Sequence, residues 1–133
     1  MKLSKAETDF VKTQGVGRFA TVGNDGVPHN VPVCPLMDGP NIYIASEKSA
    51  KKVRNLRENP NATITLDVYR DSWKNLRGVM LQGHAGIVGD KDFKRIRTKF
   101  YRKYPKYKTA SPIEPEDSVI IEIRLDKKFS WGF

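Results

Sequence analysis

The sequence predicts a mainly β domain of the α+β class, built as an antiparallel barrel of six strands with short flanking helices. Three observations lead to this fold. Several short segments alternate apolar and polar residues, which is the pattern of a half-buried strand. Turn-forming residues separate neighbouring segments, so most connections are hairpin-like. Only a few short stretches show helical spacing, so strands dominate the predicted architecture.

The N-terminal part predicts a helix followed by a hairpin. Ser4 and Glu7 fit a capping box, in which each side chain satisfies a free backbone donor at the helix start. The helix is expected to end near Gln14. A strand follows over residues 18–22, and the Asn-Asp-Gly sequence of residues 24–26 predicts the turn into the next strand.

In the second strand, three valines and a histidine share one face at a spacing of two: Val27, His29, Val31 and Val33. Pro28 and Pro32 lie on the other face. Proline has no backbone N–H to offer a neighbouring strand. One side of this strand is therefore expected to be free or irregular.

The middle of the chain predicts a strand, a helix and another strand. A turn at residues 38–40 leads into a strand over residues 42–46. A short helix follows from about residue 50, because its apolar residues fall at helical spacing, and the Asn-Pro of residues 59–60 stops it. Residues 62–69 then alternate between apolar and polar side chains and form a clear half-buried strand.

Two more strands and a longer helix complete the predicted domain. Residues 79–87 form an alternating strand whose glycines suggest bends or bulges, as at a corner of a small barrel. Asp90 begins a helix with a stripe of large apolar residues, and Pro105 ends it. The segment up to Asp117 is expected to be a polar loop, and residues 119–125 form the last strand.

Length and composition exclude several classes of protein. The 133 residues fit one domain, residues 1–133. No stretch approaches the roughly 20 apolar residues of a membrane span, and the start lacks the apolar run of a secretory signal. A lone Cys34 excludes an internal disulfide, and His29 and His84 cannot build a multi-histidine metal centre. We therefore expect a cytoplasmic protein without a metal, whose net charge of +9 suggests an anionic partner.

The stretch from residue 42 to residue 56 carries the strongest functional signal. Its strand ends in the hydroxyl of Ser46, and a short loop containing Ser49 opens a helix that carries Lys51 and Lys52. A helix start offers unpaired backbone donors and a partial positive charge, which suits a phosphate, and hydroxyls and lysines strengthen such a site. The same lysines also fit the solvated face of an amphipathic helix.

Five motifs, taken in order, resemble the pyridoxamine 5′-phosphate oxidase-like family of FMN-binding split β-barrels: residues 19–22, 26–33, 46–60, 77–85 and 130–131. Together they cover most of residues 16–133. The resemblance implies a homodimer that holds two FMN molecules in grooves at the subunit interface. It also implies an oxidoreductase acting on a small molecule. Hydride would pass through the flavin N5, so no catalytic residue is assigned to the chain.

The same resemblance implies roles for particular residues. By motif position, Ser46, Lys51 and Lys52 would contact the FMN phosphate. The backbone of the second strand at Val31, Pro32 and Val33 would run along the isoalloxazine ring, which gives the free side of that strand a purpose. Trp131 matches an aromatic residue that lies close to the flavin, in some cases from the other subunit. A core role at the chain end is equally open for Trp131.

The chain also departs from the true oxidase. Gly78 stands where the oxidase has a flavin-contacting Gln, and the segment that holds pyridoxal phosphate has no counterpart before Phe133. We therefore do not expect genuine pyridoxamine-phosphate oxidase activity. Some members of the family use a deazaflavin coenzyme, and the phosphate motif does not separate them from FMN proteins. A deazaflavin-dependent reductase is the first alternative, and a flavin store or sensor without turnover is another.

A function from a different class is a cofactor-free nucleic-acid-binding module. Residues 90–108 carry nine Lys or Arg against two Asp, together with several aromatics. Most of these aromatics are needed for the core, which leaves Tyr101 and Tyr107 for stacking on bases. We favour a solvated surface, or an entrance that attracts an anionic substrate, over nucleic acid. Arg70 and Trp73 lie in a polar loop between strands and could shape a substrate pocket.

Overall fold

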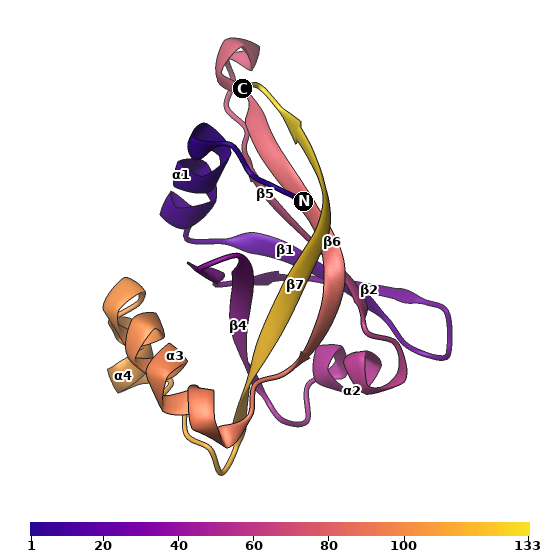
Figure 1. The fold of residues 1–133 in the computed structure, drawn as a ribbon, viewed down its shortest axis with the longest axis vertical. Coiled ribbons are helices and arrows are strands. Elements are labelled where there is room, and N and C mark those ends of the chain that lie inside the picture. The colour runs from indigo at the N-terminus through magenta and orange to yellow at the C-terminus, as the bar shows by residue number, and fades with distance from the viewer.

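One curled antiparallel sheet forms the body of the protein (Figure 1). The computed structural model describes residues 1–133. The elements, in chain order, are α1 (Lys5–Thr13), β1 (Gly17–Val22), β2 (Pro28–Val33), β3 (Leu36–Asp38), β4 (Asn41–Glu47), α2 (Lys51–Glu58), β5 (Asn61–Val68), the 3-10 helix η1 (Trp73–Asn75), β6 (Arg77–Ile87), α3 (Asp90–Lys103), α4 (Lys106–Ala110) and β7 (Ser118–Trp131). Seven strands lie in the order β2-β1-β5-β6-β7-β4-β3. Together with short flanking helices, this sheet makes a split β-barrel, so the predicted fold class is confirmed.

The structure has seven strands where the sequence predicted six. The additional strand, β3, is three residues long and pairs with β4 across a turn at Gly39, whose φ of +57° lies in the left-handed region. Three residues are too few to show an alternating pattern, so periodicity could not identify this strand. The segment predicted to be a polar loop before Asp117 also differs, because it contains the five-residue helix α4.

The free side expected for the second strand is present. Strand β2 is at the edge of the sheet and pairs only with β1. Its side chains alternate as predicted: Val33 is buried and Val31 packs against the main core, whereas Pro32 is exposed on the opposite face. The unpaired edge of β2 is therefore available to another molecule.

Two apolar clusters fill the molecule. The larger lies within the curl of the sheet and includes Phe19 and Ile64, which are fully buried. The smaller includes Phe93, Ile96 and Phe100 of α3, so the predicted apolar stripe of this helix is confirmed. None of the helices is long and apolar enough to cross a membrane.

Strands β6 and β7 are the longest, with 11 and 14 residues. Their register shifts at a bulge between Gln82 and Gly83, as the glycines of this segment predicted. A Cβ atom on Gly83 would lie 1.9 Å from the backbone oxygen of Arg124, so the two backbones approach closely here. Beyond the bulge, the two strands continue together to the C-terminal tip of the molecule (Figure 1).

Glu7 fastens α1 to this two-stranded extension. The predicted capping box is formed, with Glu7 Oε1 accepting a hydrogen bond of 2.8 Å from the backbone N–H of Ser4. The same buried carboxylate accepts hydrogen bonds of 2.6 Å from Lys128 Nζ and 2.6 Å from Ser130 Oγ on β7. The bonds from Lys128, Ser130 and Ser4 lower the pKa of Glu7 from its ordinary value of 4.5 to about 2. One charge thus joins the first helix to the last strand.

Replacing Glu7 with Gln should destabilise the fold by about 1–2 kcal/mol at pH 7, because Lys128 then loses a charged acceptor. A lowered carboxyl pKa contributes stability that is fully present above about pH 4.5 and is lost as the pH falls through about 2. The difference in unfolding free energy between the wild type and E7Q should therefore shrink as the pH falls through this range. Urea unfolding at several pH values measures it.

Glu116→Gln is the matched control, because Glu116 is exposed and makes no ion pair. This variant should be as stable as the wild type at pH 7. An E7Q variant that is equally stable, or whose deficit stays constant down to pH 2, would show that Glu7 does not hold α1 in place.

Candidate functional site

A cavity of about 290 Å³ lies where β4 ends and α2 begins. Hydroxyl-bearing and cationic side chains from four segments line it, among them Ser46, Lys52, Tyr107, Ser111 and Ser118. Antiparallel pairing of β4 with β7 brings Ser46 opposite Val119, and Glu47 opposite Ser118. The cavity is therefore closed on one side by the sheet and on the other by α4 and the segment after it.

The two lysines predicted to bind phosphate point to different places. Lys52 is half-buried, lines the cavity and takes part in no ion pair. Lys51 instead lies with its Nζ 3.5 Å from Asp25 Oδ2, in the turn between β1 and β2. Ser49 is exposed and does not line the cavity. The structure therefore brings Ser46 and Lys52 together and leaves Lys51 and Ser49 outside.

The hydroxyl groups around Lys52 can act as donors. Ser46 Oγ donates to the backbone oxygen of Glu47 at 3.0 Å, and Ser118 Oγ donates to Asp117 Oδ1 at 2.9 Å, and each can rotate toward a ligand. Burial raises the pKa of Tyr107 well above its usual value, and the neighbouring Cys34 adds to the rise. Tyr107 therefore keeps its proton at neutral pH. Sequence patterns gave no signal for Tyr107 or Ser118 here, because both come from segments far along the chain.

The start of α2 contributes backbone donors to the same region. Its N-cap residue, Ala50, has no side chain that could accept a hydrogen bond from the first turn. The free N–H groups of this turn and their partial positive charge remain available to an anion. A lysine, hydroxyls and a helix start together form an arrangement that can hold a phosphate group.

Trp131 lies at the other end of β7. Twelve residues separate it from Val119, which pairs with Ser46, and an extended strand of that length spans about 40 Å. The indole packs on Gly78 of the neighbouring strand, where a Cβ atom would come within 2.2 Å of Trp131 Cζ2. Its Nε1 is buried without a hydrogen-bond partner. In one chain, Trp131 and the cavity at Ser46 are therefore far apart.

The remaining candidate residues are scattered. His29 is half-buried, and its Nδ1 has no partner. His84 is exposed, as predicted, and its Nδ1 lies 2.9 Å from Asp126 Oδ2. Cys34 is a partly buried free thiol. Trp73 is 84% exposed in the loop before β6.

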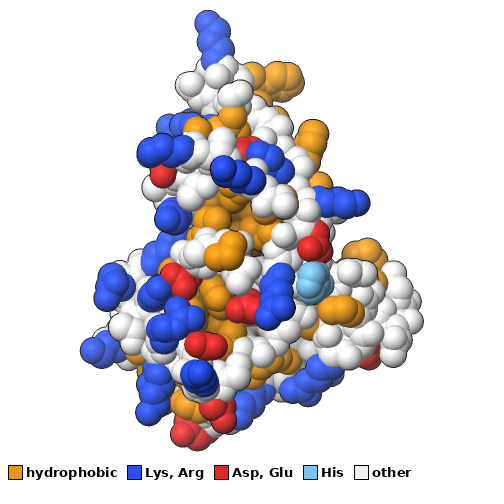
Figure 2. Space-filling view, viewed as in Figure 1, with side chains coloured by type: hydrophobic (Ala, Val, Ile, Leu, Met, Phe, Trp, Pro, Cys, Tyr) orange, Lys and Arg blue, Asp and Glu red, His pale blue; other side chains and the backbone are white.

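Several basic residues of helix α3 form ion pairs within the molecule. Arg95 and Lys99 both bind Asp38, and Lys99 with Arg95 lowers the pKa of that carboxyl. Acidic side chains lie among the basic ones over this helix (Figure 2). Tyr101 and Tyr107, the predicted stacking candidates, pack against the smaller core cluster instead. The residues expected to contact bases thus stabilise the helix on the sheet.

The sequence model of the family described as pyridoxamine 5′-phosphate oxidase matches residues 3–132. A 5a,11a-dehydrotetracycline/5a,11a-dehydrooxytetracycline reductase from Streptomyces rimosus subsp. rimosus is 35% identical over 91 residues, which are 64% of this chain and 63% of that protein. The chain thus matches less than two thirds of that relative's length.

Solved structures share the fold. A conserved hypothetical protein from Mycobacterium tuberculosis superposes with a TM-score of 0.80 at 26% identity. The match covers 98% of this chain and 86% of that protein's chain. A structure described as an F420 reductase gives a TM-score of 0.76 at 23% identity. The match covers 96% of this chain and 98% of that protein's chain.

Replacing Gly78 with Ala should displace Trp131, because the new methyl group would overlap the indole ring. In a Trp73→Phe background, tryptophan emission reports Trp131 alone. We expect a red shift as the ring moves toward water, and a loss of stability of about 1–3 kcal/mol. Gly86→Ala is the control, since a Cβ atom there meets nothing within 4 Å. Identical emission from G78A and its parent would mean that Trp131 does not rest on Gly78.

Proposed function

Because the chain belongs to the pyridoxamine 5′-phosphate oxidase family, we propose that it is a flavin-dependent oxidoreductase. It would bind FMN between two identical subunits and act on a small molecule in the cytoplasm. The observation that carries the proposal is the convergence of Ser46 and Lys52 on one cavity at the end of β4. Both residues lie in the segment whose motif resembles the FMN phosphate site of this family.

The donor set of this cavity fits a phosphate dianion. Lys52 supplies a full positive charge, and Ser46, Ser111 and Ser118 supply neutral O–H groups. Glu47 also lines the cavity, but it is exposed, so water screens its charge. The sum of these groups favours an anion over a cation or a neutral ligand.

The chain's own part in the reaction is binding and orientation. When bound, FMN supplies hydride transfer through its N5. The cavity at Lys52 fixes the phosphate end, and the unpaired edge of β2 at residues 31–33 offers backbone groups along the ring. The side chains of Val31 and Val33 face the core, so these two residues offer only their backbone to the ring. No side chain is required as a nucleophile.

A second subunit explains how Trp131 can contact a flavin whose phosphate is bound at Ser46 and Lys52. The phosphate cavity and Trp131 lie at opposite ends of β7, so a flavin that touches both needs two chains. The outer face of the sheet suits a two-fold contact, because it carries Phe129, which is 61% exposed and lies 5.8 Å from the Trp131 ring centre. A groove of about 450 Å³, lined in part by Ala20 and Thr63, crosses the same face. We therefore propose a homodimer whose subunits share each flavin.

A deazaflavin coenzyme is the second candidate. The Streptomyces relative carries the name of a reductase, and one structure of the same fold is described as an F420 reductase. The phosphate cavity suits either coenzyme, because a phosphate group is common to both. The two candidates differ in the ring that is bound and in the reactions that follow.

Lys52→Ala should weaken FMN binding by about tenfold or more, because a charge-assisted hydrogen bond to phosphate is lost. Flavin fluorescence quenching measures the affinity. Riboflavin, which lacks the phosphate, should bind the wild type and K52A equally. The same titration with a deazaflavin coenzyme compares the two candidates directly.

Arg57→Ala is the matched control, since Arg57 is an exposed cation in the last turn of the same helix. It should leave FMN affinity unchanged. Equal weakening by K52A and R57A would indicate a general effect of charge. An FMN affinity untouched by K52A would refute the assignment of the phosphate site.

A further inference from the structure

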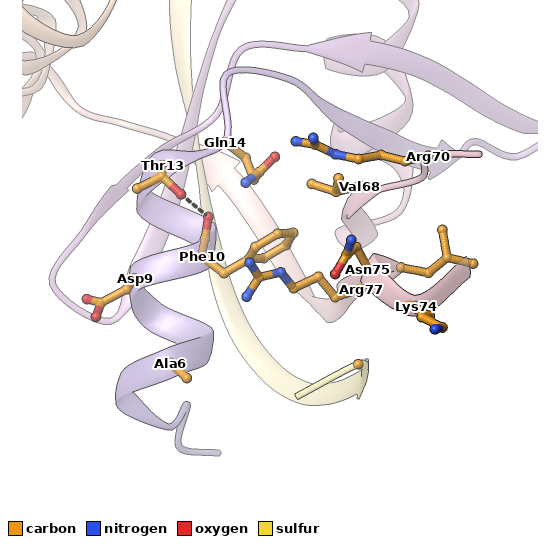
Figure 3. Close-up of a pocket in the computed structure, with 12 residues that line it drawn as sticks. Ala6, Asp9, Phe10, Thr13, Gln14, Val68, Arg70, Lys74, Asn75 and Arg77 are labelled. Atoms are coloured by element: carbon orange, nitrogen blue, oxygen red, sulfur yellow. Dashed lines mark hydrogen bonds between the residues drawn. The ribbon is translucent and has the colours of Figure 1, made fainter. Parts of the chain in front are cut away.

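A cavity of about 780 Å³ lies between α1 and the segment that joins β5 to β6 (Figure 3). Polar side chains from both sides enter it, chiefly Gln14, Arg70, Asn75 and Arg77. It shares no lining residue with the cavity at Ser46. It is thus a separate site, which the proposed cofactor does not account for, and of its lining residues only Arg70 was expected to shape a pocket.

The charge of this cavity is positive and uncompensated. Arg70, Lys74 and Arg77 line it, and none of them takes part in an ion pair. The only acidic lining residue, Asp9, binds Lys5 Nζ at 2.8 Å and points away from the arginines (Figure 3). All three cations are exposed, so water screens part of their mutual repulsion, and an anion bound between them would reduce it further.

Arg77 is held in place for such a role. Its guanidinium carbon lies 5.6 Å from the ring centre of Phe10 and 5.8 Å from that of Phe133. These two rings pack edge to face at 5.4 Å, so they form a fixed aromatic support. An arginine ordered in this way loses less conformational entropy when it binds a ligand. Its planar guanidinium group can donate two parallel hydrogen bonds to an oxyanion.

The rest of the lining sets the shape of the ligand. Phe10, Val68 and Leu76 give the cavity an apolar wall beside its cationic groups. Gln14 and Asn75 offer amide groups that can donate or accept. A ligand that satisfies all of these has an acidic oxyanion at one end and an apolar, preferably flat, body at the other.

We propose that this cavity binds a small organic anion, whose carboxylate or phosphate is held by Arg70 and Arg77 and whose apolar body lies against Val68 and Leu76. Gly132 also lines the cavity, whereas the Trp131 indole lies on the opposite face of β7, because Lys128 and Ser130 face α1. The anion site is therefore independent of the proposed flavin site.

Isothermal titration of the full chain with 2-naphthoate tests the anion site without any cofactor. We expect one 2-naphthoate per chain, and at least tenfold weaker binding of the neutral 2-naphthamide, which has the same ring system. Arg70→Gln and Arg77→Gln should each weaken 2-naphthoate binding about tenfold. Because Arg70 lies in an exposed loop, R70Q keeps the test valid if R77Q folds poorly.

Two further variants separate this proposal from the cofactor proposal. R57Q removes an exposed cation elsewhere and should bind 2-naphthoate as the wild type does. K52A should also bind it normally, whatever its effect on FMN. Equal affinity for naphthoate and naphthamide, or unchanged affinity in both R70Q and R77Q, would overturn the anion site. Normal naphthoate binding in a wild-type protein that binds neither flavin nor deazaflavin would support the anion site and refute only the cofactor proposal.

Discussion

The structure depends on one long strand, β7, and on its pairing along both β4 and β6. Its first half carries the buried residues Ile121 and Ile123 and pairs with β4 up to Ser46, which lines the cavity with Lys52. Its second half passes the bulge at Gly83 and carries Lys128, which binds Glu7 and so fixes α1. The register of this strand therefore places both the cavity at Ser46 and the cavity at Arg77.

The same strand sets the distance that defines the proposed mechanism. A cavity suited to phosphate lies at one end of β7 and an aromatic residue suited to a flavin ring lies at the other, so a single chain cannot bring them to one ligand. Two chains packed through the outer face of the sheet could do so. A split barrel with a free edge at β2 and an exposed Phe129 leaves room for such a partner. In the proposed mechanism, the flavin site therefore belongs to the dimer and not to a single chain.

Local sequence signals predicted much of the fold. The capping box at Ser4, the alternation of residues 62–69 and the apolar stripe of α3 were all confirmed, because each depends on neighbours in sequence. The strand β3 and the helix α4 were not predicted, since three and five residues are too few to show a period.

The site was predicted less completely than the fold. Adjacent lysines look alike in sequence, yet Lys52 faces the cavity while Lys51 faces Asp25, and only the packing of α2 decides this. The cationic cavity at Arg77 joins segments about sixty residues apart in the chain. Position in a polar loop pointed to Arg70, but no local pattern could bring Phe10 and Gln14 to it.

The most direct test of the shared site is a mixing experiment with two variants that each bind FMN poorly, K52A and W131A. In a mixed dimer, one site combines Lys52 of the W131A chain with Trp131 of the K52A chain and is intact, while the other carries both defects. Random mixing should restore tight FMN binding at about a quarter of all sites. If each flavin were held within one chain, every site would keep one defect, and mixing would restore no binding.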